Sequence, residues 1–399
     1  MLDAFIYAGV RTPFGRAAGA LSRIRPDDLL AQAVAAAVAD SGFSPDQFED
    51  VVAGCANQAG EDARNVARHA ALRAGLPVGV AGIAVNRLCG SGLAAVLDAA
   101  RAAHAGQGAL FVAGGVESMS RAPFVFAKNE APFGRDIRVF DSTIGARFPN
   151  PAIEQAFGAD TMPQTADNIA ADLNIGRDET DAFAAASQAK YAEANAGGFF
   201  DGEIRPVEFA VKGKAVVVSA DEHPRSETTI ETLAALKPLQ AGGVVTAGNA
   251  SGVNDGAAAL IIGTRAAGTA AGVRPRGRIV AGAVAGVAPR VMGLGPVPAC
   301  EKALARAGLT LADMDVIEIN EAFAVQVLGC CRLMGLAGDD PRLNPNGGAI
   351  AIGHPLGASG ARITLTALRQ LERTGGRYAL VSMCIGVGQG VAAVIQRLD

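Results

Sequence analysis

Tryptophan is absent from this 399-residue chain, and aromatic residues make up only 5% of it. Hydrophobic residues nevertheless reach 50%, so small and branched aliphatic side chains must fill the cores. The chain has four histidines, all far apart, and six cysteines without any C-x-x-C spacing. This pattern fits neither a zinc site nor a small disulfide framework. We therefore expect no bound metal and a reducing compartment.

The chain also lacks a strong charge bias and long apolar runs. Its 35 Lys and Arg residues balance 39 Asp and Glu residues, for a net charge of −4, and no basic block suggests nucleic-acid binding. No uncharged apolar run reaches the roughly 18 residues of a membrane span. Residues Met1–Ile6 have no positive segment and no long apolar segment of a signal peptide. We expect a cytoplasmic protein that binds neither nucleic acid nor membrane.

Short apolar runs alternate with helical segments along the first 120 or so residues. Val51–Gly54 and Ala109–Gly114 are typical of buried strands, and Pro26 begins a helix that Gly42 ends. Glu61–Ala74 is predicted to be another helix. This alternation predicts an α/β fold with mostly parallel sheets covered on both faces.

The same order of elements returns near the C-terminus. A helix over Ala299–Ala307 leads into the apolar run Asp315–Ile319, much as the first helix leads into Asp50–Ala53. Gly357–Gly360 opens a helix in the way that Cys89–Gly92 does. The matching pairs lie about 265–270 residues apart and keep their order, which indicates two duplicated α/β halves.

The stretch between the halves differs from them in composition. Phe, Pro, Asn and Asp cluster from about Arg121 to Pro163, and one helical segment is expected over Gln164–Ala196. Because so long an insertion is usually functional, we expect it to fold over the mouth of a site. The predicted division is an N-terminal half over residues 1–121 and 247–270, an inserted loop domain over 122–246 and a C-terminal half over 271–399.

Cys89 lies at a turn between an apolar run over 80–85, predicted to be a buried strand, and a predicted helix over 93–107. Its flanking glycines let the backbone bend sharply and approach a ligand. A helix N-terminus offers free N–H groups and a positive dipole end, which lower a thiol pKa and bind an oxyanion. A lone cysteine at such a turn also fits a buried structural thiol, so the rest of the chain has to decide.

Three further stretches carry reactive or polar groups near predicted strand ends: Asn320–Ala324, Gly353–Gly360 and Cys384–Gly390. Each alone has an ordinary explanation: a helix cap, a loop histidine and an inert buried thiol. Strand ends of α/β sheets are where ligands bind, and a thiolate nucleophile needs a base such as His354. A second thiol can act as acid or base, and glycines leave N–H groups for an oxyanion. Together these stretches favour nucleophilic catalysis.

These four stretches, with Thr246–Ala259, resemble the signatures of thiolases, the acyl-CoA:acetyl-CoA C-acyltransferases. The resemblance covers essentially the whole chain. It implies two duplicated halves in a layered αβαβα arrangement and a ping-pong reaction. Its partners would be coenzyme A and acyl-CoA, with no metal or redox cofactor. It also implies a homo-oligomer, a tetramer built as a dimer of dimers.

The resemblance assigns catalytic roles to five residues. Cys89 would be the nucleophile that becomes acylated, and His354 would activate it and help hold the thioester oxygen. Asn320 would orient a water in that same oxyanion site. Cys384 would exchange protons with the acetyl-CoA α-carbon or the coenzyme A thiol. Gly386, with the Cys89 N–H, would form a second oxyanion hole.

The same resemblance implies residues that bind coenzyme A and the acyl group. Ser251 would touch the pantetheine arm, Arg225 the phosphates near the adenosine, and Met162 would line the acyl pocket. Ala247 and Phe323 complete this set.

The substrate subclass rests on three shorter stretches: Asn86–Leu88, Asp141–Phe148 and Thr161–Asn168. They resemble 3-oxoadipyl-CoA thiolases and lack the His-Met pair typical of short-chain biosynthetic enzymes. Because the substrate would end in a carboxylate, a cation is expected in its pocket, and Arg147 and Arg121 are the candidates.

Several alternatives stay open at this point. An acetoacetyl-CoA thiolase or a broad-range 3-ketoacyl-CoA thiolase would share the same catalytic residues. A ketoacyl synthase would share the fold and the cysteine but would need a decarboxylating site, usually with a second histidine. A non-catalytic CoA-binding protein would not need both Cys89 and Cys384.

Overall fold

One mixed sheet organises the chain in a computed structural model that describes residues 2–129 and 131–398. Its strand order is β12-β13-β14-β11-β1-β10-β5-β3-β4, and the short β2 (Gly15–Arg16) pairs with β10. The first-half strands are β1 (Ala4–Arg11), β3 (Asp50–Gly54), β4 (Ala81–Val85), β5 (Leu110–Ser118) and β10 (Asn254–Gly263). The second-half strands are β11 (Gly277–Gly286), β12 (Val316–Ile319), β13 (Tyr378–Ile385) and β14 (Gln389–Arg397).

Strand direction agrees with the predicted mostly parallel sheets, although the pairing is mixed. Among the described strands of the first half, all but β10 run the same way, and in the second half all but β14 do. These two strands, β10 and β14, each lie inside their half of the sheet, so the pairs that they form with both neighbouring strands are antiparallel. The two halves join where β1 and β11 pair over three residues of each strand.

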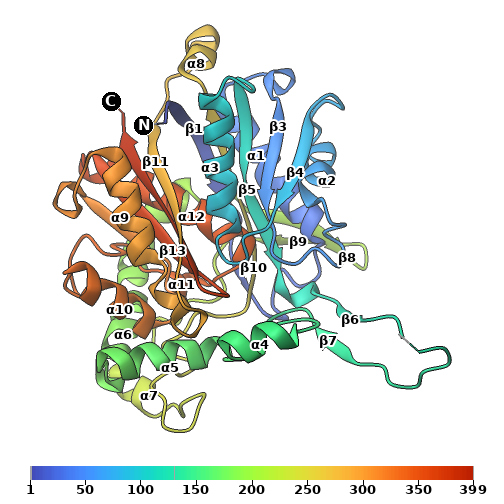
Figure 1. Ribbon diagram of the computed structural model, residues 1–399. Coiled ribbons are helices and arrows are strands. Elements are labelled where there is room, and N and C mark those ends of the chain that lie inside the picture. Colours follow the sequence, from blue (N-terminus) through green and yellow to red (C-terminus); the bar gives the residue numbers. More distant parts are fainter. Residues whose placement is uncertain (1, 130, 399) are drawn as a thin grey trace.

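The helices form the layers that the sequence predicts. In Figure 1, α3 (Ser91–His104) and α12 (Leu356–Thr374) lie in the middle, and they contact the strands of both halves. Helices α1 (Pro26–Ser41) and α2 (Val66–Arg73) cover the outer face of the first half, and α9 (Pro296–Ala307) covers that of the second. Helix α10 (Ala324–Met334) packs beside α9. Three apolar cores fill the spaces between these layers. The αβαβα arrangement is thus confirmed.

The duplication is confirmed by equivalent elements in the same order. Helices α1 and α9 both end at a glycine in the left-handed region, Gly42 with φ 76° and Gly308 with φ 68°. Each is followed by a 3-10 turn, Pro45–Gln47 or Leu311–Asp313, and then by β3 or β12. At the place that β4 takes beside β3, a single parallel bridge joins Ile317 of β12 to Leu343.

Two predictions in the first half need correction. The apolar run before Cys89 does form β4, but it is not buried: β4 is the edge of the sheet, and Ile83 is 44% exposed. The helix predicted to begin at Glu61 begins at Val66, because Asn65 caps it by accepting a hydrogen bond from the Arg68 N–H. An apolar run cannot by itself distinguish an edge strand from a central one.

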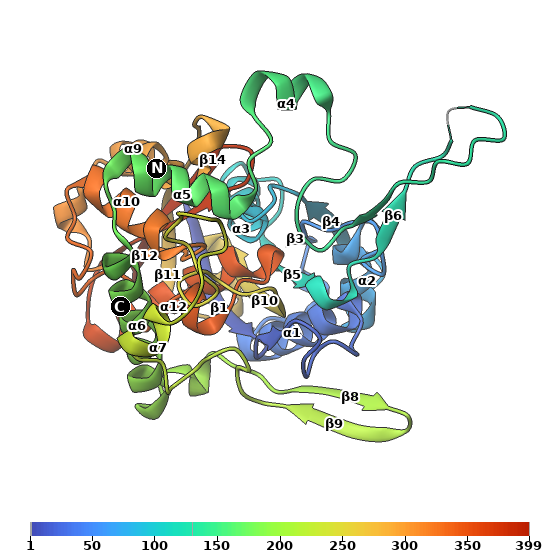
Figure 2. The same ribbon diagram turned by 90° about the horizontal axis from the view of Figure 1, so that it is seen from below.

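The inserted segment is not one continuous helix with loops. Helices α5 (Met162–Leu173) and α6 (Arg177–Ala196) are separate, because Asn174 adopts a left-handed φ of 53° between them. Figure 2 shows two hairpins reaching away from the body, one with β6 and β7 and one with β8 and β9. The remaining elements of this segment are β6 (Phe124–Phe126), β7 (Val139–Asp141), α4 (Pro151–Phe157), β8 (Val207–Val211), β9 (Lys214–Val218) and α7 (Ile230–Ala234).

Two short helices remain, α8 (Arg265–Ala271) and α11 (Ala349–Ile352). Helix α8 links β10 of the first half to β11 of the second, and α11 comes just before Gly353 and His354. The domain boundaries drawn from the sequence stay a prediction.

Candidate active site

The turn that carries Cys89 is held by its own polar side chains. Asn86 accepts a hydrogen bond from the Leu88 N–H at 2.9 Å and donates one to the Ala56 carbonyl at 3.0 Å. Ser91 accepts from the Arg87 N–H at 2.8 Å and donates to the Leu88 carbonyl at 2.6 Å. Asn86 and Ser91 therefore serve to shape the turn.

Leu88 adopts an uncommon left-handed conformation, with φ 47°, directly before the cysteine. The turn ends at Gly90, the residue before α3, and a Cβ at Gly90 would lie 2.6 Å from Cδ1 of Ile385. The cysteine turn of the first half thus packs directly against the end of β13 in the second half.

The pKa of the Cys89 thiol differs from the sequence prediction. Burial raises its pKa to about 11, although the backbone N–H groups of Gly386 and of Cys89 itself act in the opposite direction. The prediction that the helix N-terminus leaves a lowered thiol pKa is therefore wrong for this structure. At neutral pH the thiol is protonated, so its attack on a carbonyl requires a base.

The helices that follow the two reactive turns touch at their first turns. A Cβ at Gly92 of α3 would lie 2.5 Å from the Gly357 carbonyl oxygen of α12, a distance that only glycine allows. Cys89 precedes Gly92 by three residues, and His354 precedes Gly357 by three. The nucleophile candidate and the base candidate thus lie in equivalent turns before two touching helices, although the residue that corresponds to Cys89 in the second half is Gly357.

His354 is held by a buried serine of the same loop. Its Nδ1 lies 2.7 Å from the Ser359 Oγ, and that hydroxyl donates to the Pro355 carbonyl at 2.9 Å. Because the one hydroxyl proton of Ser359 is used on Pro355, we assign the imidazole proton to Nδ1. The Nε2 atom then carries a free lone pair and can accept a proton.

His354 is neutral in the resting protein. Burial, with the nearby guanidinium of Arg362, lowers its pKa to about 3. Arg362 is itself fully buried, 3.8 Å from Glu318. A neutral imidazole can take the proton of a neutral thiol when attack begins, which is what general-base activation of a cysteine requires.

Asn320 and Cys384 lie at the ends of neighbouring strands next to His354. The Asn320 N–H donates to the Ser382 carbonyl at 2.9 Å, and its Nδ2 lies 3.4 Å from His354 Nε2. Its buried Oδ1 has no hydrogen-bond partner among the described residues, so the amide remains available to a water or substrate. Burial and the nearby Cys89 thiol raise the pKa of Cys384. These contacts link the four reactive residues through the ends of β12 and β13.

Part of the predicted binding set lies beside this centre. A Cβ at Gly386 would lie 3.4 Å from Leu88 and 3.9 Å from the Met162 sulfur, so Met162 is within reach of the reactive end. Ser251 donates its N–H to the Ala322 carbonyl at 2.9 Å, and a β-bridge joins Ala250 to Phe323. The structure therefore brings Ser251 and Phe323 together along the Asn320–Ala324 loop.

Two other predicted binding residues, Arg225 and Ala247, are exposed. The Arg225 backbone N–H donates to Gln188 at 3.0 Å, and within residues 2–129 and 131–398 its guanidinium makes no ion pair. Its charge is free for an anionic group in solvent, whereas nothing ties Ala247 to the reactive residues.

The two carboxylate candidates lie elsewhere in the described chain. Arg121 forms a two-bond ion pair with Glu61, 2.7 Å between Nη2 and Oε1. Arg147 is half-buried and donates to the Ser142 carbonyl at 3.2 Å. No hydrogen bond within the described residues joins either guanidinium to Cys89 or His354. Carboxylate binding by either arginine stays a prediction, and Arg121 already has Glu61 as its partner.

Two residues of the site escaped the sequence reasoning. Ser359 sits five residues after His354 in a motif that was recognised, but its hydrogen bond could not be inferred from spacing. Glu321 is a buried carboxylate that accepts bonds from Ser187, Asn344 and the Ile350 N–H, at 2.7, 2.8 and 3.1 Å. Glu321 thus fixes the segment that leads to His354.

Comparison with known proteins identifies the family and its fold. Residues 4–266 match the family model "Thiolase, N-terminal domain", and residues 273–397 match "Thiolase, C-terminal domain". The chain belongs to the thiolase family. It is therefore an acyltransferase, and the match to the thiolase models leaves the ketoacyl synthase and the non-catalytic CoA-binding protein less well supported.

The most informative relatives match over their full length. The chain is 57% identical over 401 residues to a "3-oxoadipyl-CoA/3-oxo-5,6-dehydrosuberyl-CoA thiolase" of Escherichia coli, covering all of both chains. It is 55% identical to a "Beta-ketoadipyl-CoA thiolase" of Acinetobacter baylyi, also over all of both. A human mitochondrial 3-ketoacyl-CoA thiolase solved in complex with CoA matches with a TM-score of 0.91 and 40% identity, over 100% of this chain and 98% of the other.

The described residues contain no helix long and apolar enough to span a bilayer. Nor do they hold a cluster of three or more histidine, cysteine or acidic side chains placed to bind a metal ion.

Proposed function

We propose that this thiolase cleaves 3-oxoadipyl-CoA with coenzyme A to give acetyl-CoA and succinyl-CoA. The observation that carries the proposal is the contrast among relatives. Those named beta-ketoadipyl-CoA thiolase are 53–57% identical over essentially the full length, whereas an "Acetyl-CoA acetyltransferase" of Escherichia coli is 43% identical. An acetoacetyl-CoA or broad-range thiolase is the second candidate, and it is less well supported.

In the first half-reaction, Cys89 loses its proton to Nε2 of His354 and attacks the 3-keto carbon. The alkoxide formed would accept hydrogen bonds from the N–H groups of Gly386 and Cys89, while the thioester oxygen of the substrate would lie on the Asn320–His354 side of the site. Collapse of the alkoxide breaks the C2–C3 bond, and Cys384 protonates C2 of the departing acetyl-CoA enolate. The thioester carbonyl takes up the electron pair of the broken bond, so this step calls for no metal or redox cofactor.

In the second half-reaction, coenzyme A resolves the succinyl-Cys89 intermediate. The Cys384 thiolate left by the first step takes the proton of the coenzyme A thiol, which then attacks the acyl carbon. The N–H groups of Gly386 and Cys89, which already act on the Cys89 sulfur, would hold the oxyanion. Collapse expels the Cys89 thiolate, and the proton on His354 returns to it.

Coenzyme A and the acyl chain would lie along the residues predicted to bind them. Phe323 lies on the loop that bears Asn320, and Ser251 is hydrogen-bonded to Ala322 of that loop, which suits contact with the pantetheine arm. The unpaired guanidinium of Arg225 suits the phosphates, and Met162 suits the acyl pocket. Arg147 remains the candidate for the terminal carboxylate, since its hydrogen bond goes to a backbone carbonyl and the nearby Asp62 forms no ion pair with it among the described residues.

The protein is proposed to be a tetramer, a dimer of dimers, that acts in the cytoplasm. Two features support an oligomer. The β6–β7 hairpin exposes large apolar side chains, with Phe124 71% and Phe133 100% exposed, and β4 leaves an unpaired sheet edge. Light scattering of the purified protein tests this proposal, and a monomeric mass would contradict it.

The test of function is a steady-state comparison of kcat/KM for 3-oxoadipyl-CoA and acetoacetyl-CoA, with coenzyme A as acceptor. We expect a higher kcat/KM for 3-oxoadipyl-CoA. A clearly higher kcat/KM for acetoacetyl-CoA would instead identify the protein as an acetoacetyl-CoA thiolase. Mass spectrometry of enzyme quenched with substrate should place the acyl group on Cys89. An acyl group on another residue, or one retained by Cys89→Ser, would contradict the site assignment.

A further inference from the structure

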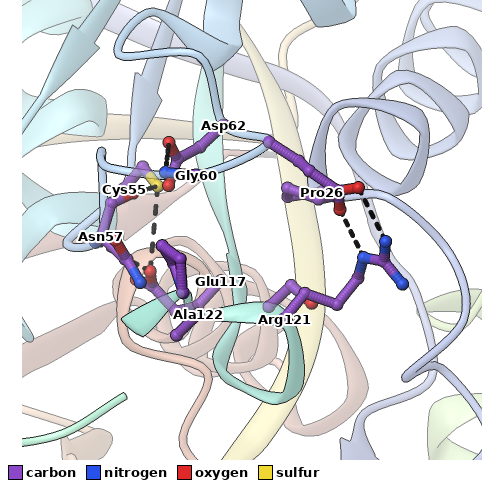
Figure 3. Close-up of a pocket in the computed structure, with 11 residues that line it drawn as sticks. Pro26, Cys55, Asn57, Gly60, Asp62, Glu117, Arg121 and Ala122 are labelled. Carbon is purple, nitrogen blue, oxygen red and sulfur yellow. Dashed lines mark hydrogen bonds and ion pairs between the residues drawn. The ribbon is translucent and has the colours of Figure 1, made fainter. Parts of the chain in front are cut away.

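Glu117, near the end of β5, is a fully buried carboxylate that the proposed reaction does not use. Figure 3 shows it facing Cys55 and Asn57 across a small cavity. The cavity volume is about 10 Å³, room for about one water molecule. A buried carboxylate is costly unless hydrogen bonds satisfy it, so its partners indicate what it holds in place.

The partners of Glu117 come from two different parts of the chain. Its Oε1 accepts from the Asn57 N–H at 2.9 Å, and its Oε2 accepts from the Ala56 N–H at 3.0 Å. These residues follow β3 in the first half. The same Oε2 also accepts from the Gly357 N–H at 2.9 Å, in the first turn of α12 in the second half. One carboxylate therefore joins the two halves.

The backbone groups that Glu117 binds on its two sides are each connected to a reactive residue. On one side, the Ala56 carbonyl accepts the hydrogen bond from Asn86, which shapes the Cys89 turn. On the other side, Gly357 lies between Pro355 and Ser359, whose hydroxyl holds the His354 ring. Hydrogen bonds, connected by the backbone of Ala56 and of residues 355–359, thus lead from the Cys89 turn through Glu117 to His354.

We propose that Glu117 is a positioning residue that sets the placement of His354 relative to Cys89. It does so by binding the Cys55–Asn57 segment and the start of α12 with the same carboxylate. The inference rests on the roles proposed above for Cys89 and His354. Small displacements between a nucleophile and its base are costly, since a shift of about 1 Å can reduce a rate about 100-fold.

The charge of Glu117 disfavours catalysis, so an effect of Glu117 on position can be distinguished from an effect of its charge. Its negative charge raises the pKa of Cys89, so it disfavours the thiolate. A residue kept only for electrostatic activation of the thiol would have the opposite sign. Its loss should therefore make Cys89 more acidic and yet make turnover slower.

The test compares the wild type with Glu117→Gln, which keeps the side-chain volume but removes the charge and turns an NH₂ group toward backbone N–H donors. We expect kcat per titrated active site to fall roughly 10- to 100-fold with KM within twofold. The pH profile for alkylation of Cys89 by iodoacetamide should move to lower pH. Asp50→Asn, also a carboxylate-to-amide change, lies at the start of the neighbouring strand β3, far from the Ala56–Asn57 segment at its end, and is the matched control that should leave kcat unchanged.

Folding is checked by circular dichroism and thermal unfolding. Should Glu117→Gln fail to fold, Asn86→Ala breaks another bond of the same series without touching the charge, and should lower kcat with an unmoved alkylation profile. A folded Glu117→Gln enzyme with wild-type kcat would overturn the proposal. A wild-type enzyme inactive on both acyl-CoA substrates would instead overturn the proposed function, and the alkylation profile would still report on Glu117.

Discussion

Gly92 and Gly357 bring the first turns of α3 and α12 into backbone contact, because a methyl group at Gly92 would lie 2.5 Å from the Gly357 oxygen. Gly360 makes a similar approach, since its Cβ would lie 2.1 Å from the Leu93 nitrogen. A clash with backbone, unlike one with a flexible side chain, can be relieved only by moving a helix. The spacing of the two reactive turns therefore depends on these glycines.

Replacing Gly92 with alanine should destabilise the protein by about 1–3 kcal/mol, because the added methyl forces the helices apart. The intrinsic gain of about 1 kcal/mol for alanine in a helix opposes but does not cancel this cost. Urea unfolding measures the difference. Gly79→Ala is the control, since a Cβ there would meet nothing within 4 Å. Equal stability of Gly92→Ala and wild type would show that the helices can separate freely.

Removing the Ser359 hydroxyl should slow catalysis by about 10- to 100-fold, because the His354 proton is no longer confined to Nδ1. Ser359→Ala is compared with Thr364→Ala, which removes another buried hydroxyl from α12, one that donates to the Gly360 carbonyl at 2.8 Å. Both variants should lose similar stability, but only Ser359→Ala should lose kcat with an unchanged KM for coenzyme A. An equal loss of kcat in both variants would show that Ser359 has only a structural role.

The neutral state of His354 makes stability depend on pH in a defined direction. Its folded pKa of about 3 lies below the ordinary value of 6.5, so between these values the unfolded chain binds a proton that the folded protein does not. The contribution to stability is therefore lost as pH falls. From pH 7 to pH 5, the unfolding free energy of the wild type should fall by about 2 kcal/mol more than that of His354→Asn. Identical pH dependence would contradict the neutral buried imidazole.

If Arg147 binds the substrate carboxylate, Arg147→Ala should raise KM for 3-oxoadipyl-CoA about 10- to 100-fold, the effect of losing one charged hydrogen bond. KM for acetoacetyl-CoA, which has no terminal carboxylate, should stay the same. Arg135→Ala serves as the control, since Arg135 is an exposed arginine of the same inserted segment. An equal change for both substrates would remove Arg147 from the specificity site.

The sequence predicts the layers and the reactive turns because both depend on local patterns. Alternating apolar and helical segments, repeated in order, are sufficient to predict the two halves. The strand-to-helix turn places Cys89, whereas His354 lies in a turn between two helices, α11 and α12. The exposure of β4 could not be predicted, because it depends on which strand ends the sheet. The break at Asn174 needs a left-handed residue that helical periodicity does not reveal.

The partners of buried polar residues were beyond the sequence for a related reason. Glu117 does leave a signal, since it is a charged residue at the end of an otherwise apolar strand, but its three N–H donors come from residues 60 to 240 positions away. The rise in the Cys89 pKa is likewise a property of the assembled site, where burial outweighs the helix N-terminus.

The equivalent turns that carry Cys89 and His354 bear on how the two halves have diverged. Two identical half-length chains, paired as these halves are, would carry the same residues at both turns. Here Gly357 stands in the second half where the first has Cys89, and Asn86 stands in the first half where the second has His354. Since the duplication, each half has thus come to supply one member of the nucleophile and base pair, so neither half can work without the other.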